Sequence, residues 1–233
     1  MSTLYLFPVS LSETDIHWVL PQHNIELVKS IKHFIAEDAK TARRFLKLCG
    51  YPNLPEAEIT LLNEHTATNS INQLLNPLLE GKNVGLMSDA GCPGIADPGA
   101  DVIALAHKKG IRVVPLVGPS SIVLAIMASG FNGQNFAFNG YLPIEKDKRM
   151  KRIRELEVLA SKHDQAQYFI ETPYRNIQLL NDLLATLNAS TQLCVASNLT
   201  DVSQEIITRS VSEWKKSGAP QINKIPAVFG IYS

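Results

Sequence analysis

The densest group of residues that could do chemistry is the segment SDAGCPGIADPG, from Ser88 to Gly99. Its 12 residues include two carboxylates, three glycines and two prolines. Glycine lets a backbone approach a ligand closely, and proline stiffens a loop. Asp89 could accept hydrogen bonds from a ribose or an amino group. We therefore expect a ligand-binding loop; the alternative is a tight turn in which Asp97 caps the next helix.

Two further carboxylates, Glu37 and Asp38, follow the apolar segment Phe34–Ala36. A hydroxyl that attacks an electrophile must lose its proton, and a carboxylate can accept it. We therefore predict Glu37 and Asp38 as catalytic residues, with Glu37 ranked first. The alternative is that both residues cap a helix that begins near Thr41.

A basic run, EKDKRMKRIR from Glu145 to Arg154, carries six basic residues. It could attract phosphates, or it could be the solvated face of an amphipathic helix. His17 and His23 have no third ligand nearby in the sequence, so we predict no metal site.

The elements that position these residues alternate along the chain. Strands are expected at LYLFPV (Leu4–Val9), HFIAE, EITLLN, VGLMSDAG and IRVVPLVG, separated by helices that include Asn24–His33 and Asn69–Leu79. Alternating strands and helices with short connections indicate a mostly parallel sheet. Ligands of such sheets bind beyond the carboxyl ends of the strands, which is where both carboxylate groups fall.

A second set of elements begins at PSSIVLAIMASG, which is expected to be a helix. It continues with a strand FAFNGYLP, a charged helix, a strand QAQYFIET, a helix RNIQLLNDLLATL, an arm QEIITRSVSEWKKSG and a last strand AVFGIYS. The segment VGP at Val117–Pro119 would form a tight turn between two self-sufficient sets. We therefore predict two α/β domains, 1–117 and 118–233.

Composition limits the class of protein. Of 233 residues, 45% are hydrophobic, and 22 basic residues balance 22 acidic ones, so any contact with nucleic acid must be local. Three widely spaced cysteines fit reduced thiols in a cytoplasmic protein. The start lacks the pattern of a signal peptide, and no apolar run is long enough to cross a bilayer, so we expect no membrane association.

Six ordered segments resemble the tetrapyrrole methylase superfamily: LYLFPV, FIAED, SDAGCPGIADPG, GIRVVPLVGPSS, FNGYLP and FIETPYR. The resemblance covers nearly the whole chain and is nearest to the branch that methylates a ribose 2′-hydroxyl in small-subunit ribosomal RNA. It implies two α/β domains with S-adenosylmethionine in the cleft between them. It also implies a homodimer, with ribosomal RNA or the small ribosomal subunit as partner.

The resemblance assigns cofactor contacts by position. Asp89, Ala90, Gly91, Pro93 and Ile95 would lie along S-adenosylmethionine, with Pro8 and Ser10 from the first loop. The remaining contacts would come from Ser120, Ser121, Glu171, Asn198, Leu199, Pro226, Ala227 and Val228. Ser120 and Ser121 could instead be helix N-caps, and Pro226 could simply begin an edge strand.

The chain also departs from the ribose-methylating branch. Pro8–Asp15 lacks the glycine-asparagine pair of that branch, Ser197 and Asn198 replace an arginine-glutamate pair, and Lys224–Pro226 replaces lysine-glycine-glutamate. The segment IPAVFG (residues 225–230) resembles the tetrapyrrole-methylating enzymes more than the ribose-methylating branch. Three functions therefore remain open: an RNA ribose 2′-O-methyltransferase, a methylase of a tetrapyrrole-like or other small molecule, and a non-catalytic relative that binds S-adenosylmethionine.

Overall fold

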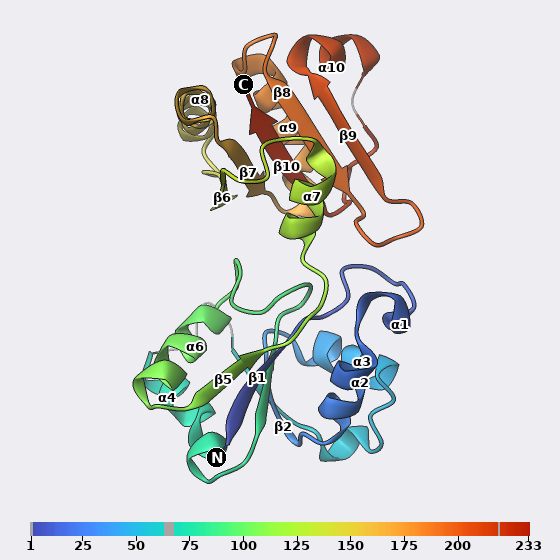
Figure 1. Ribbon diagram of the computed structural model, residues 1–233, viewed down its shortest axis with the longest axis vertical. Helices are drawn as coiled ribbons and strands as arrows, with labels where there is room; N and C mark the ends of the chain where they lie inside the picture. The colour runs from blue at the N-terminus through green and yellow to red at the C-terminus, as the bar shows by residue number, and fades with distance from the viewer. Residues whose placement is uncertain (1, 63–67, 219) are drawn as a thin grey trace. The chain divides into compact units, whose positions relative to one another are not determined.

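The computed structural model describes residues 2–62, 68–218 and 220–233. The chain divides into two compact units, Met1–Ser120 and Ser121–Ser233, each with its own sheet (Figure 1). The sequence placed this boundary after residue 117. Each unit is described by itself below.

The first unit is built on a five-stranded parallel sheet. Its strands are β1 (Thr3–Phe7), β2 (His33–Ala36), β3 (Glu58–Leu61), β4 (Val84–Met87) and β5 (Arg112–Pro115). They lie in the order β3-β2-β4-β1-β5, and every neighbouring pair runs parallel. The mostly parallel sheet predicted from the alternating pattern is confirmed.

Helices cover both faces of this sheet (Figure 1). One face carries α1 (Ile16–Val19), α2 (Gln22–Lys29) and α3 (Ala39–Leu48), and a short 3₁₀ helix, η1 (Leu54–Glu56), follows α3. The other face carries α4 (Thr68–Leu74), α5 (Asn76–Leu79) and α6 (Gly99–Lys108). The single helix predicted over 69–79 is wrong, since it is interrupted at Leu75 and restarts with Pro77 in the first turn of α5. Proline has no N–H to continue a helix but suits a first turn.

The second unit has a mixed five-stranded sheet. Its strands are β6 (Phe136–Tyr141), β7 (Ala166–Ile170), β8 (Gln192–Ser197), β9 (Glu205–Ser210) and β10 (Ala227–Tyr232), in the order β6-β7-β10-β8-β9. Only β6 and β7 are parallel; the other pairs are antiparallel. Its helices are α7 (Ser121–Ser129), α8 (Lys146–His163), α9 (Asn176–Thr186) and α10 (Val211–Ser217), with a 3₁₀ helix η2 (Pro173–Arg175) before α9. The predicted arm consists of β9 and α10, joined by a capping box of Ser210 and Glu213.

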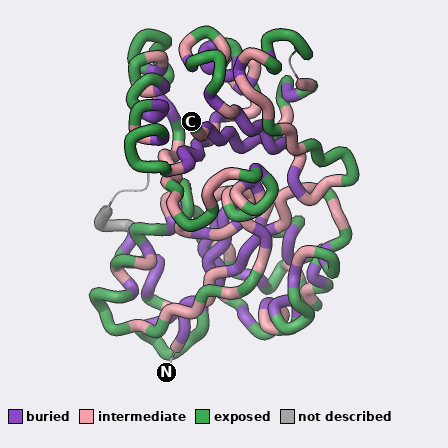
Figure 2. Tube along the Cα trace, turned by 45° about the horizontal axis from the view of Figure 1, so that its top comes forward, coloured by how far each residue is buried: buried purple, intermediate pink, exposed green. Residues whose placement is uncertain are grey.

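The second unit buries a continuous core between its sheet and α8, α9 and α10. Ile153 and Leu156 of α8 and Trp214 of α10 belong to this core and are at most 1% exposed. On the other face, Ser129 Oγ of α7 lies 2.7 Å from Tyr168 Oη of β7. Buried residues follow the strands and the inward turns of the helices (Figure 2).

The basic run on α8 is divided by this packing. Arg149 is 2% exposed, and its Nε and Nη2 donate to Asp182 Oδ2 on α9 at 2.8 and 2.6 Å. Arg149 also donates to the carbonyl of Pro143. It is therefore a structural residue that anchors the loop before α8, and only the remaining cations of the run face solvent.

None of the described helices combines the length and the apolar character that a membrane span needs.

Candidate functional site

The order of the strands in the first unit favours the region beyond β1 and β4 as the candidate ligand site. These strands are neighbours, but the chain leaves β1 toward the face covered by α1–α3 and leaves β4 toward the face covered by α6. Because the two connections diverge, a crevice opens outside the carboxyl ends of this pair. The loops that border it are Pro8–Asp15 and Ser88–Gly99, which the sequence singled out.

The two loops are joined by a short backbone bridge. Val9 N–H donates to Gly91 O, and Gly91 N–H donates to Val9 O, both at 2.9 Å. Gly91 has a φ of +77°, and a Cβ there would lie 3.3 Å from Leu11 Cδ2. The first loop lacks the family's glycine, but Gly91 of the second loop permits the close approach instead.

A pocket of about 270 Å³ opens beside this bridge. Its wall is formed by the first loop, by one face of α3 and by the start of the second loop. The lining residues are Val9, Ser10, Leu11, Ser12, Glu13, Thr41, Arg44, Phe45, Leu48, Asp89 and Ala90. Ser10 Oγ is buried and has no hydrogen-bond partner among the described residues. A buried hydroxyl without a partner is costly, so a polar ligand atom at this point would be stabilising.

Asp97 organises the second loop from within. Its carboxylate accepts hydrogen bonds from Gly94 N–H at 2.9 Å and from Gly99 N–H, at the start of α6, at 2.6 Å. Asp97 therefore holds the turn that leads into α6, but the N-cap of this helix is Pro98 and not Asp97, as the capping alternative had it. Burial raises the pKa of Asp97, although these backbone N–H groups oppose the shift.

Glu37 and Asp38 follow β2, next to the same loop. Glu37 Oε1 accepts a hydrogen bond from Asp89 N–H at 3.3 Å, and burial together with the negative charge of Asp97 raises the Glu37 pKa. Asp38 is the N-cap of α3 and accepts from Thr41 N–H at 2.7 Å, which holds its pKa below the usual range. The capping alternative is confirmed for Asp38 alone. Glu37 is the better placed of the two to accept a proton, since its pKa lies closer to neutral.

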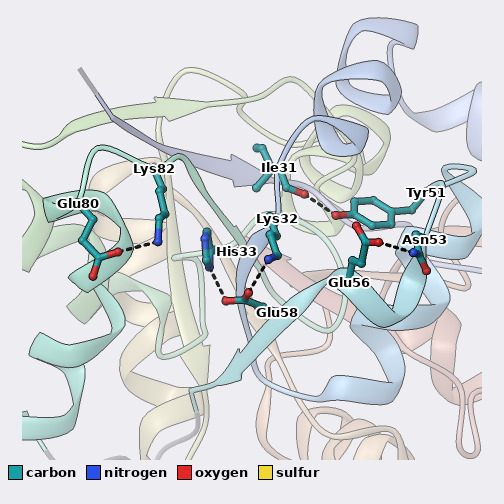
Figure 3. Close-up of polar contacts among 9 residues, drawn as sticks. All are labelled: Ile31, Lys32, His33, Tyr51, Asn53, Glu56, Glu58, Glu80 and Lys82. Carbon is teal, nitrogen blue, oxygen red and sulfur yellow. Dashed lines mark hydrogen bonds and ion pairs between the residues drawn. The ribbon is translucent and has the colours of Figure 1, made fainter.

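Among the described residues, charged side chains form ion pairs at the amino ends of the strands in the first sheet, but the carboxylates that follow β2 and β4 form none. At the amino ends of β2, β3 and β4, Glu58 forms an ion pair with Lys32 Nζ and contacts His33 Nδ1, each at 2.9 Å, and Lys82 forms an ion pair with Glu80 at 2.7 Å (Figure 3). At the carboxyl ends, none of the carboxylates of Glu37, Asp38, Asp89 and Asp97 forms an ion pair within the part of the chain that is described. This edge is therefore acidic and suits a cationic ligand.

Among the described residues, no group of three or more His, Cys, Asp or Glu side chains is arranged so that it could hold a metal ion.

Comparisons with known proteins agree on one family. A family model described as Tetrapyrrole (Corrin/Porphyrin) Methylases matches residues 20–214. The chain belongs to the tetrapyrrole methylase family. It is therefore a member of a family of methyltransferases, and the sequence resemblance is confirmed. The match begins at residue 20, so the unusual first loop lies before the matched range.

Relatives within the tetrapyrrole methylase family carry a more specific name. The "Ribosomal RNA small subunit methyltransferase I" of Escherichia coli O157:H7 is 30% identical over 211 residues, which are 90% of this chain and 70% of the relative. The protein of the same name from Bacillus subtilis strain 168 is 32% identical over 213 residues, which are 91% of this chain and 69% of the relative.

A solved structure shows the same fold. The methyltransferase CobJ aligns with a TM-score of 0.65 at 14% identity, and the alignment covers 100% of this chain and 93% of that one. Two α/β domains of tetrapyrrole methylase type, as predicted, are thereby confirmed as the fold of the chain.

The other residues that the family resemblance assigns in the first unit are placed as follows. Pro8 is buried, and a Cβ on Gly118 would come within 2.4 Å of its Cβ, so the two residues are in tight contact. Pro93 is buried and Ile95 is 48% exposed. Ser120 closes the first unit, and Ser121 begins α7 of the second.

The residues assigned to the cofactor in the second unit gather at one end of its sheet. Because β10 runs antiparallel to β7 and β8, its start lies beside their ends, with Val228 opposite Ile170 and Ala227 opposite Ser197. Glu171, Asn198, Leu199 and Pro226 adjoin these positions. Asn198 N–H donates to Pro226 O at 3.0 Å, and Glu171 accepts from Arg175 Nη2 at 2.6 Å.

Sequence reasoning missed the wall of the pocket formed by α3. Thr41, Arg44, Phe45 and Leu48 all lie on one stripe of this helix and line the pocket. Their spacing of three and four residues is the helical signal that could have found them, since such residues share a face. Nothing in their types pointed to a ligand.

Proposed function

We propose that this protein is an S-adenosylmethionine-dependent methyltransferase that methylates a ribose 2′-hydroxyl of small-subunit ribosomal RNA. The observation that carries the proposal is membership in the tetrapyrrole methylase family together with relatives named for methylation of small-subunit ribosomal RNA. An acceptor of this kind also places the proposed activity in the cytoplasm.

The first unit supplies groups that fit the cofactor. S-adenosylmethionine brings a cationic sulfonium and an ammonium, and it supplies an electrophilic methyl group when bound. The unpaired carboxylates at the carboxyl ends of β2 and β4 would stabilise those positive charges. Ser10 Oγ would gain a partner, and Phe45 and Leu48 offer an apolar wall. The pocket volume of about 270 Å³ suits one moiety of the cofactor.

Glu37 is the residue we propose as proton acceptor. The Glu37 carboxylate would take the hydroxyl proton as the acceptor oxygen bonds to the methyl carbon and the sulfur leaves with the electron pair of the broken carbon–sulfur bond. The raised pKa of Glu37 makes its conjugate acid weaker and the carboxylate a better base. Correct positioning of the hydroxyl relative to the methyl group would supply much of the remaining rate enhancement.

Methyl transfer from labelled S-adenosylmethionine tests this function. The acceptors are unmodified small-subunit ribosomal RNA, offered free and as assembled subunits. We expect label in the RNA at a phosphodiester that resists alkali, because a methylated 2′-oxygen cannot attack the adjacent phosphate.

Absence of label in every assembly state would contradict the RNA proposal. Transfer to a precorrin-like macrocycle instead would support the small-molecule alternative, which the IPAVFG segment at Ile225–Gly230 favours. Failure to bind S-adenosylmethionine in calorimetry would leave only the non-catalytic alternative.

We also propose a homodimer, as the resemblance implies. Trp18 and Val202 are 77% and 95% exposed, and large apolar side chains so exposed are common at protein interfaces. Light scattering at micromolar concentration should give a mass twice that of the chain; a monomer mass would contradict this part of the proposal.

A further inference from the structure

The second unit carries a hollow whose lining resembles a site for a nucleotide of single-stranded nucleic acid. The hollow has a volume of about 450 Å³ and lies between the start of α8 and the outer face of α9. It is lined by Lys146, Tyr174, Ile177, Gln178, Asn181 and Asp182. It combines an aromatic ring, a cation and two amides.

The ring of Tyr174 is available for stacking. Tyr174 is 78% exposed, and Lys224 Nζ lies 5.8 Å from the centre of its ring. Exposed aromatic rings beside cations are the usual elements that bind unpaired bases and their phosphates. One face or edge of this ring is therefore free to receive a base.

The backbone that carries Tyr174 is held on both sides. Arg175 N–H donates to Thr172 O at 2.8 Å, and Arg175 Nη2 donates to Glu171 at 2.6 Å. Lys224 N–H donates to Pro173 O at 3.1 Å. The backbone φ of Lys224 is +61°. A left-handed backbone at a lysine is strained and persists because its surroundings hold it. The backbone hydrogen bonds therefore fix the positions from which the side chains of Tyr174 and Lys224 extend.

The charge of the hollow is positive. Asp182 is its one lining carboxylate, and Arg149 neutralises it through two hydrogen bonds to Oδ2. Lys146 and Lys224 form no ion pair with a carboxylate in the described segments. By contrast, Lys148 and Arg152 of the same basic run pair with Glu145 and Glu155. Lys146 is therefore the cation of α8 best able to bind a phosphate at this place.

The hollow adjoins the residues assigned to the cofactor in the same unit. Tyr174 is three residues after Glu171, and Lys224 is two residues before Pro226. Asn176 Nδ2 donates to Ile225 O at 2.6 Å and so ties the start of α9 to the segment before β10. A nucleotide in the hollow would lie beside the predicted cofactor contacts of this unit.

We propose that this hollow binds an unpaired nucleotide of the RNA substrate, with the base stacked on Tyr174, the phosphate near Lys146 and Lys224, and the base edge or 2′-hydroxyl against Gln178 and Asn181. The inference rests on the proposed function, because it names the part of the chain that holds the RNA. Amide side chains can both donate and accept, as recognition of a base edge requires.

Fluorescence anisotropy with a labelled single-stranded RNA of about six nucleotides tests the site. Tyr174→Leu should weaken binding about tenfold, whereas Tyr174→Trp, which keeps an aromatic face, should bind within about twofold of the unchanged protein. Lys146→Gln should weaken binding and reduce the dependence of log Kd on log salt by about one. Lys162→Gln, about 24 Å further along α8, is the matched control and should leave affinity unchanged.

Affinity for S-adenosylmethionine is measured on the same variants and should not change. RNA affinity that Tyr174→Leu and Lys146→Gln leave intact would overturn the inference, even if ribosomal RNA is methylated. Loss of cofactor affinity in Tyr174→Leu would also overturn it, because the ring would then belong to the cofactor site. Tyr174-dependent RNA binding without methyl transfer would support the hollow and contradict the proposed activity.

Discussion

The carboxylates at the carboxyl ends of β2 and β4 influence stability and binding in opposite directions. Burial raises the pKa values of Glu37, Asp89 and Asp97. A raised carboxyl pKa means that the folded state binds the proton more tightly than the unfolded state does. Stability is therefore greatest below the unfolded pKa and falls as pH rises to the folded pKa. A bound cation would offset this cost by favouring the ionised carboxylates.

Glu37→Gln separates the two effects. At neutral pH the substitution removes a partly buried negative charge, so the melting temperature should rise slightly and should vary less as the pH rises above the ordinary glutamate pKa of 4.5. Methyl transfer should fall about 10²- to 10⁴-fold, as expected when a general base is lost. Thermal unfolding at several pH values and the labelled-methyl assay measure these changes.

Glu205→Gln, at an exposed position on β9, is the control and should change neither quantity. Undiminished transfer by Glu37→Gln would exclude this residue as the proton acceptor.

At the scale of the elements, the first loop is positioned by contacts with segments distant in the sequence. Val9 is bridged to Gly91, and Pro8 packs against Gly118 beyond β5. The loop Pro8–Asp15 contains no glycine. Its backbone path depends on Gly91 and Gly118, where a Cβ would approach Leu11 and Pro8. The pocket wall contributed by Ser10 therefore depends on Gly91 and Gly118.

Gly118→Ala tests this dependence. A Cβ at position 118 would come within 2.4 Å of Pro8 Cβ and 3.0 Å of Leu20 Cδ2, so the first loop must shift. Overpacking of this kind costs about 1–3 kcal/mol. We expect a lower free energy of unfolding in urea and a weaker affinity for S-adenosylmethionine.

Gly133→Ala is matched to it, because no heavy atom lies within 4 Å of the added Cβ and the backbone φ is not in the left-handed region. It should alter stability by less than about 0.5 kcal/mol. Equal behaviour of the two variants would show that the contact between Pro8 and Gly118 does not position the loop.

At the scale of the whole molecule, each unit encloses its own core. The first unit has two clusters of buried side chains, one on each face of its sheet, and the second has one large cluster under α8, α9 and α10. Units of this size with independent cores can unfold separately.

Single core truncations should therefore act on one unit at a time. Leu46→Ala in the first unit and Ile153→Ala in the second each remove a side chain that is 0% exposed, at a cost of about 2–5 kcal/mol. Calorimetry of the full chain should show two transitions, and each variant should lower only one of them. A single transition that both variants lower equally would mean that the units unfold as one cooperative body.

The sequence by itself determined the local features. Alternating apolar strands and amphipathic helices predicted the parallel sheet of the first unit, and glycine, proline and aspartate predicted the loop Ser88–Gly99. Asp38 and Asp97 were recognised as candidates for helix-start roles, because capping depends on residues only two or three positions away. The family resemblance rested on such short, ordered segments.

Only the tertiary structure decided which distant residues share a site. The bridge from Val9 to Gly91, the wall formed by α3, the burial of Arg149 against Asp182 and the hollow beneath Tyr174 all join segments far apart in the chain. Periodicity shows which face of an element is buried but not which partner covers it. The physical reason is that these contacts arise from the order of strands and the packing of helices, which local patterns do not specify.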